Sequence, residues 1–175
     1  MDGRIVKPTG IERRLQPDEV IVSRNDLRGV ITGCNDAFVR YSAYGAEELY
    51  GAPHSLIRHP EMPRAVFKLM WDEIQAGREV FLFVKNLAKD GSHYWVIAQV
   101  LPELVNGMVL SFLSFRRCPV RRGVERFEAL YARMRAEEQR LGGEAGMEAA
   151  LQMLREDLQG LGQGYEALVY GSPGE

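Results

Sequence analysis

Three extended apolar segments in the middle of the chain restrict its fold more than any other feature. They cover Glu79–Leu87, His93–Leu101 and Met108–Arg116, and the turn pairs Asp90-Gly91 and Asn106-Gly107 join them. Asp-Gly and Asn-Gly between apolar runs predict tight hairpins, so the three segments form an antiparallel meander. Apolar side chains occur at both parities of these strands, which predicts a sheet that is covered on both faces.

Shorter elements precede the meander. Two short strands are predicted at Val20–Arg24 and Val30–Thr32, on either side of a turn rich in Asx and Gly. Brief helices are expected at Ala37–Tyr41 and Ala46–Leu49. The stretch before the first strand carries Gly, Pro and charge, with one helical turn expected near residues 11–15. This stretch is predicted to be an N-terminal cap or a flexible segment.

The candidate functional region runs from His54 to Pro63 and through the helix that follows it to about Gln75. Pro60 favours an extended backbone just before it, and Pro63 suits the first turn of a helix. Apolar side chains cover roughly two-thirds of the circumference of that helix. A surface helix needs one apolar stripe, so the second stripe requires a cover of its own. More core, a partner protein or a bound planar ligand would each provide it.

Polar residues near this helix are candidates for holding such a ligand. Arg58 and His59 can donate to a phosphate or a ring carbonyl, and a surface ion pair between Arg58 and Glu61 is the alternative. Asn86 has the parity of Val84 and is expected on the same face of the sheet. A buried amide needs partners there, which the edge of a heterocycle can supply; capping of the following turn is the alternative.

The histidines also allow metal or haem binding to be considered. His54 and His59 lack a matching Cys or carboxylate set, and their spacing does not align them on one helix face, so a metal site is not predicted. An axial haem ligand needs only one histidine, so haem stays open as an alternative. Cys34 and Cys118 are too few for a disulfide framework, which indicates a reducing compartment.

Composition and charge exclude several other classes. A chain of 175 residues fits one domain of about 100–150 residues plus an appendage. A formal net charge of −2 gives no general reason to expect nucleic acid or an anionic membrane as a partner. The pairs Arg116-Arg117 and Arg121-Arg122 are a local exception, but they flank a predicted linker and are interpreted as solvated charge. Because no signal peptide or membrane-spanning run is present in the sequence, a soluble, cytoplasmic protein is expected. No nucleophile, phosphate-loop or paired-carboxylate motif stands out, so an enzyme is not expected.

From Gly123 the pattern becomes helical, with a break at Gly142-Gly143. A small helical hairpin or a dimer seam is predicted. More apolar side chains repeat along this region than a lone helix can hide, so we expect it to mediate self-association: Phe127, Leu130, Met134, Leu151, Leu154 and Leu158.

Several runs of the sequence resemble the sensory PAS domain of bacterial aerotaxis receptors. The most specific is Arg58-His59-Pro60-Glu61-Met62-Pro63, and further matching runs are Ile31–Val39, Pro53–Ile57, Met70-Trp71, Val84–Asn86 and Asp90–Val96. The resemblance extends from roughly Val20 to Arg117. It implies an α+β PAS fold, in which a five-stranded antiparallel sheet carries short helices on one face and C-terminal helices follow. The corresponding division is residues 1–19 as the N-terminal segment, 20–117 as the PAS sensory domain and 118–175 as the helical extension.

The resemblance also implies a function. Domains of that family bind FAD non-covalently and report redox state or oxygen-linked electron flow to a signalling partner. Its flavin-associated positions correspond to Asn35, Arg58, His59, Glu61, Trp71 and Asn86, and His54 is a further candidate on the same segment. The family usually has Asp at the position of Glu61, and it often has a Trp at the start of the first long strand, where this chain has Val80-Phe81. A cofactor-free PAS module for dimerisation or docking is the main alternative, and a haem-based gas sensor is the next.

Overall fold

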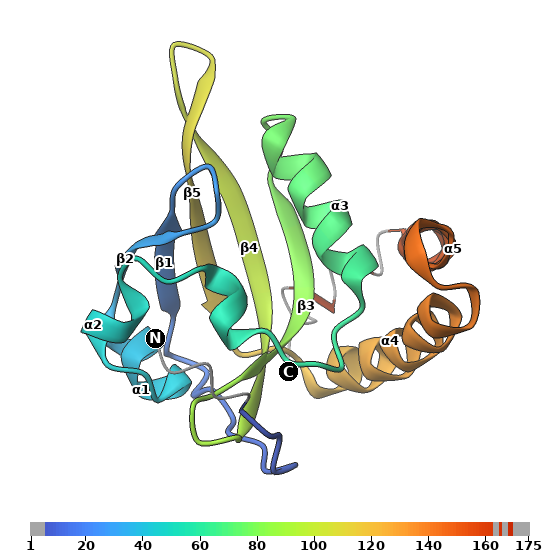
Figure 1. The fold of residues 1–175 in the computed structure, drawn as a ribbon, viewed down its shortest axis with the longest axis horizontal. Helices are drawn as coiled ribbons and strands as arrows, with labels where there is room; N and C mark the ends of the chain where they lie inside the picture. The colour runs from blue at the N-terminus through green and yellow to red at the C-terminus, as the bar shows by residue number, and fades with distance from the viewer. Residues whose placement is uncertain (1–5, 163–164, 166–167, 170–175) are drawn as a thin grey trace.

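A central antiparallel sheet organises the computed structural model, which describes residues 6–162, 165 and 168–169 (Figure 1). The strands lie side by side in the order β2-β1-β5-β4-β3. Their bounds are β1 Ile21–Asn25, β2 Ile31–Cys34, β3 Val80–Leu87, β4 His93–Val105 and β5 Met108–Arg117. The five-stranded antiparallel sheet of an α+β fold, expected from the sequence, is confirmed.

The two predicted hairpins form where the turn signals place them. Ala88 N–H donates to the carbonyl of Ser92 at 2.8 Å across the Asp90-Gly91 turn. Asn106 and Gly107 both have positive φ, 51° and 78°, the conformation that a two-residue hairpin turn with the correct twist requires. The β4–β5 hairpin is longer than expected, and its tip projects beyond the rest of the sheet (Figure 1).

Short helices cover one face of the sheet. They are α1 (Asp36–Ser42), α2 (Ala46–Leu49), the 3₁₀ helix η1 (His54–Ile57) and α3 (Arg64–Gln75). The helix after the His54 segment therefore begins two residues later than Met62, because Pro63 is its N-cap. Figure 1 shows α3 lying across β3 and β4, while α1 and α2 flank β1 and β2.

The opposite face of β3 and β4 is covered by α4 (Arg121–Leu141). Phe127 stacks on Phe83 with 4.6 Å between ring centroids. Tyr131 stacks on Trp95 and donates its hydroxyl proton to the carbonyl of Phe83 at 2.8 Å. The chain then reverses at Gly142 into α5 (Gly143–Leu161), which packs beside α4 and α3 (Figure 1). Both faces of the sheet are thus covered over β3 and β4, which agrees with the apolar residues at both parities of these strands.

The apolar residues of the C-terminal helices are buried inside this chain. Five of the six that suggested self-association are at most 2% exposed: Phe127, Leu130, Met134, Leu151 and Leu154. Leu158 is partly buried against the same core. The reason for expecting a dimer seam is therefore wrong, because these side chains cover the sheet and α3 instead of a second copy.

The N-terminal segment packs along the start of β4. His93 N–H donates to the carbonyl of Ile11 at 2.8 Å, and Arg13 N–H donates to the carbonyl of His93 at 2.7 Å. These bonds give residues 11–13 an extended course, so the helical turn expected there is wrong. The weak helical propensity of this segment is outweighed by its backbone hydrogen bonds to the unpaired edge of β4 at His93.

A residue of α4 caps the first turn of α3. Pro63, the N-cap of α3, has no side chain that can accept a hydrogen bond. Glu138 accepts instead, from Arg64 N–H at 3.1 Å and from Ala65 N–H at 2.9 Å. A carboxylate at this position also interacts favourably with the positive end of the helix dipole. Glu138 therefore ties α4 to α3 across a long stretch of sequence.

We expect Glu138→Ala to destabilise the protein by about 1–2 kcal/mol, the cost of losing a helix cap together with the burial of two unpaired N–H groups. Glu137→Ala is the matched control, since Glu137 pairs with the exposed Arg140 and its loss should cost much less. Urea unfolding of both variants measures the difference. Equal midpoints for the two would contradict the capping role.

Truncation after Arg122 should yield an unstable fragment that associates through its exposed sheet, because it uncovers Phe83 and Trp95 and leaves α3 without its cap. Sedimentation and thermal unfolding of the fragment and the full chain test this expectation. A monomeric fragment with the midpoint of the full chain would show that α4 and α5 add nothing to the fold.

Candidate functional site

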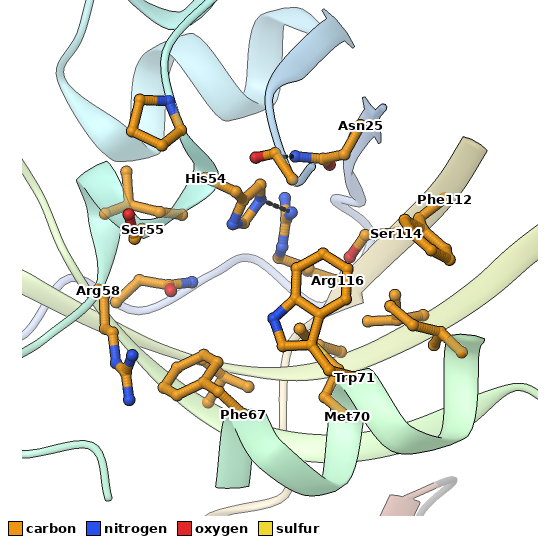
Figure 2. A pocket seen from close by; sticks show the side chains of 18 of the residues that line it. Asn25, His54, Ser55, Arg58, Phe67, Met70, Trp71, Phe112, Ser114 and Arg116 are labelled. Carbon is orange, nitrogen blue, oxygen red and sulfur yellow. Dashed lines mark hydrogen bonds between the residues drawn. The ribbon is translucent and has the colours of Figure 1, made fainter. Parts of the chain in front are cut away.

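A cavity of about 300 Å³ lies between the inner face of the sheet, α3 and the η1 segment (Figure 2). Its volume is at the lower end of the range for small-molecule sites. Much of the lining is aromatic or aliphatic: Phe67, Met70, Trp71, Ile74, Val84, Ala98, Val100 and Phe112. Polar residues also line it: Asn25, Arg28, His54, Ser55, Arg58, Asn86, Ser114 and Arg116.

Trp71 forms one wall and is held in place on two sides. Its ring meets Phe112 edge to face, with 5.4 Å between centroids. On the other side it lies against Gly29, where a Cβ atom would come within 3.1 Å of the indole ring. Gly29 has φ +79°, so any other residue would be strained there as well as crowded. The turn between β1 and β2 therefore positions this wall.

Arg58 lies in the lining with its guanidinium 3.8 Å from the centroid of the Phe67 ring. Burial lowers the pKa of Arg58 from its ordinary value, yet the group stays cationic at neutral pH. The alternative of a surface pair with Glu61 is not what forms, because Glu61 accepts from Lys85 Nζ at 2.5 Å. The positive charge of Arg58 therefore lies in the wall of the cavity and is not paired with Glu61.

Asn86 faces the cavity together with Val84, as strand parity predicts. It is 3% exposed, and its Nδ2 has no hydrogen-bond partner among the described residues. The alternative of turn capping is wrong, because Asp90 performs that task by accepting from Ser92 N–H at 3.0 Å. A buried amide donor is thus available to a ligand.

His54 and Arg116 lie close together in the lining of the cavity (Figure 2), and the buried Ser23 contacts both of them. Arg116 Nη2 donates to Ser23 Oγ at 2.6 Å and to His54 Nε2. Burial, followed by the charge of Arg116, holds the pKa of His54 well below its ordinary value. Because an arginine can only donate, His54 is neutral and carries its proton on Nδ1.

The other three candidate residues lie outside the cavity. Asn35 caps α1, accepting from Phe38 N–H at 3.1 Å and donating to the carbonyl of Val20 at 2.8 Å. His59 is 2% exposed and packs against His93, 5.7 Å away between ring centroids. Glu61 pairs with Lys85 on the face of the sheet that α4 covers. The structure therefore brings together His54, Arg58, Trp71 and Asn86 but not Asn35, His59 and Glu61.

Sequence reasoning missed Arg116, the most buried charged group of the lining. It interpreted the pair Arg116-Arg117 as solvated charge next to a linker. Strand parity contained the signal, because Arg116 is in phase with Phe112 and Ser114, which both face the cavity. A charge in phase with interior positions is a candidate site residue.

Comparison with known proteins agrees with this architecture. Residues 31–116 match the family model described as the PAS fold. The LOV domain of the blue-light photoreceptor Aureochrome1 superposes with a TM-score of 0.54 at 18% identity, covering 66% of this chain and 91% of that domain. A light-oxygen-voltage domain studied with a flavin analogue superposes with a TM-score of 0.53 at 20% identity, covering 62% and 82%. These structural likenesses establish the fold alone.

Taken with the sheet order and the cavity between sheet and helices, the family match identifies residues 31–116 as a PAS domain. This domain resembles that of the aerotaxis receptor of Escherichia coli (strain K12), which is 38% identical over 122 residues, or 70% of this chain. A nitrogen fixation regulatory protein of Klebsiella pneumoniae is 28% identical over 99 residues, or 56% of this chain. The aligned regions span 24% and 20% of those two proteins.

The described residues contain neither a membrane-spanning helix nor a metal-binding cluster. None of the helices in this part of the chain is long and apolar enough to span a bilayer. Within the same residues, no cluster of three or more His, Cys, Asp or Glu side chains has the arrangement of a metal site.

His59 should make the protein less stable in weak acid. Burial lowers its pKa from 6.5 to about 4, so between these values the unfolded chain binds a proton that the folded chain does not. Stability therefore falls as the pH drops through this window, by up to about 1.4 kcal/mol per pH unit from this residue.

His59→Asn keeps an acceptor for Glu61 N–H, which donates to His59 Nδ1 at 3.2 Å, and it cannot be protonated. Urea unfolding between pH 7 and pH 4.5 should give a shallower loss of stability for this variant. His54 and His93 remain in both proteins, so the difference isolates His59. Parallel curves would show that His59 takes up a proton in the folded state.

Proposed function

We propose that this PAS domain binds FAD non-covalently and reports redox or oxygen-linked state to a signalling protein in the cytoplasm. The observation that carries the proposal is the unpartnered Nδ2 of Asn86 in a largely apolar cavity. Leaving a buried amide donor unpaired costs about 1–3 kcal/mol. A planar heterocycle with carbonyl or ring-nitrogen acceptors along one edge removes that cost, while Trp71 and Phe67 offer aromatic surface to its faces.

The relatives support this ligand class. The Escherichia coli relative is an aerotaxis receptor, and one domain of the same fold was studied with a flavin analogue. Two cations in the lining suit a dinucleotide rather than a bare ring, since Arg28 is exposed and Arg58 is partly buried. Both can hold the phosphates of FAD while the ring occupies the interior.

Haem fits the geometry less well. His54 lies in the cavity, but its Nε2 already accepts a hydrogen bond from Arg116. His59 lies outside the cavity lining and accepts from Glu61 N–H through Nδ1. A cofactor-free docking module would leave the Asn86 donor unpaired, with no compensating contact.

The residues around Asn86 provide a route from the cavity to the C-terminal helices. When bound, a flavin supplies a ring whose edge gains a proton and charge on reduction. Asn86 can follow that change by rotating its amide, which presents either a donor or an acceptor. The preceding residue, Lys85, points to the opposite face, where its Nζ contacts Glu61 at 2.5 Å and Glu128 of α4 at 3.5 Å.

A movement of β3 would therefore reach α4 directly, through the contact between Lys85 and Glu128. The signalling partner is therefore proposed to contact the α4–α5 hairpin, and the protein is proposed to act as a signalling module rather than an enzyme. A homodimer is still a prediction, now without the apolar residues that first suggested it.

We expect purified protein to be yellow or to take up added FAD, and Arg58→Ala to bind FAD tenfold to hundredfold more weakly. This loss corresponds to about 1.5–3 kcal/mol for one charge-assisted hydrogen bond. The control is Arg78→Ala, because Arg78 pairs with Glu73 at the far end of α3 and is not in the lining. Absorbance per mole of folded protein during FAD titration gives both affinities.

Three results would count against the proposal in different ways. Equal FAD affinity in Arg58→Ala and wild type would remove Arg58 from the site. A sharp Soret band in place of a flavin spectrum would make the ligand a haem. A colourless wild type that takes up no added FAD would refute the flavin site itself.

A further inference from the structure

Arg116 is a buried cation without a counterion. It is 2% exposed, near the end of β5, and it lines the inner part of the cavity with Ser114 (Figure 2). Among the described residues, no carboxylate forms an ion pair with it. The ring of Phe38, whose centroid lies 4.9 Å from the guanidinium carbon, offers a cation–π contact only.

The hydrogen bonds of Arg116 leave part of the group unused. Nη2 donates to Ser23 Oγ and to His54 Nε2, both neutral acceptors. Nη1 is buried and has no partner within the described part of the chain. Burying a charge without a partner is among the costliest arrangements in a protein interior. A fold that retains it in a cavity wall has a donor and a charge ready for a ligand.

The neighbours of Arg116 do not depend on it. Ser23 Oγ lies 3.4 Å from His54 Nε2, so the serine hydroxyl can donate to the histidine if the arginine is removed. Arg116 also differs from Arg58, whose guanidinium stacks on Phe67 and points away from the Arg116–His54 pair in Figure 2. The two cations therefore serve different parts of a bound molecule.

We propose that Arg116 binds an electron-rich carbonyl or anionic group of the ligand ring, and so makes the cavity prefer a negatively charged ring to a neutral one. The inference rests on the proposed flavin function. There, a bound flavin would supply the redox chemistry: two electrons from a donor such as dithionite and one proton from water would leave the reduced ring with one negative charge. Arg116 lowers the free energy of that product more than that of the oxidised ring, which raises the reduction potential of the bound flavin.

The experiment compares wild type with Arg116→Met, Arg116→Gln and Arg116→Lys, and uses Arg117→Met as the control. Arg117 is the next residue of β5 and loses the same charge, but it is exposed and is not part of the lining. For each protein, FAD titration gives the affinity of the oxidised form, and titration with dithionite beside a reference dye gives the potential. Thermal unfolding of the flavin-free protein gives the third measurement.

Arg116→Met and Arg116→Gln are expected to weaken binding of the reduced flavin, relative to the oxidised form, by about tenfold to hundredfold. For a two-electron couple, this ratio is a fall in potential of about 30–60 mV. Arg116→Lys should retain most of the wild-type potential. Arg117→Met should leave the ratio of the two affinities within about threefold of the wild-type ratio, because the charge that it removes is exposed to solvent. Flavin-free Arg116→Met should unfold at a temperature equal to or above that of wild type, because a buried unpaired charge has been removed.

Three outcomes overturn the inference. An unchanged potential in flavin-bound Arg116→Met or Arg116→Gln refutes it while leaving the flavin site intact. Failure of both variants to fold assigns Arg116 a structural role and refutes it too. A wild-type protein that binds no FAD removes the proposed function and this inference with it.

Discussion

Strand β3 contacts the cavity with one face and α4 with the other. Alternate residues of a strand point to opposite faces, so Val84 and Asn86 meet the cavity while Phe83 and Lys85 meet α4. A strand covered on both faces cannot shift by one residue without exposing apolar groups and burying charge. The register of β3 is consequently fixed, and the cavity and the C-terminal helices share one rigid backbone.

The cavity holds two unfavourable polar groups of this fold. The Nδ2 of Asn86 and the Nη1 of Arg116 are both buried without partners among the described residues. Two further atoms of this kind in the described part of the chain, Nδ1 of His93 and Oη of Tyr94, lie outside the lining. A ligand that satisfies both donors must carry hydrogen-bond acceptors at two places around a flat apolar body.

Local signals in the sequence predicted most of the fold. Asp90-Gly91 and Asn106-Gly107 set the hairpins, and strand parity directed Asn86 inward. The site was predicted less completely, because residues adjacent in sequence can face different layers. The neighbours Arg58 and His59 show this, since Arg58 lines the cavity and His59 packs against His93.

Long-range contacts were beyond what the sequence pattern could predict. The heptad-like spacing of Phe127, Leu130 and Met134 showed that α4 has an apolar side, but not which surface it covers. Arg116 was misjudged because a pair of arginines beside a turn resembles solvated charge, whereas parity with Ser114 gives it an interior position. Its burial depends on α1 and η1, which supply Phe38 and His54 from other parts of the chain.

Because Glu138 caps α3, the segment that can be transferred to another protein with its fold intact is longer than the family match. The family match ends at residue 116, while the helix that carries Trp71 depends on a carboxylate that lies beyond that end. Recombination or gene fusion at residue 116 would transfer the strands and α3. It would not transfer the carboxylate of Glu138, which caps the first turn of α3. Evolution can therefore exchange this sensor between proteins only as a longer segment than sequence similarity outlines, or by finding a substitute for one carboxylate.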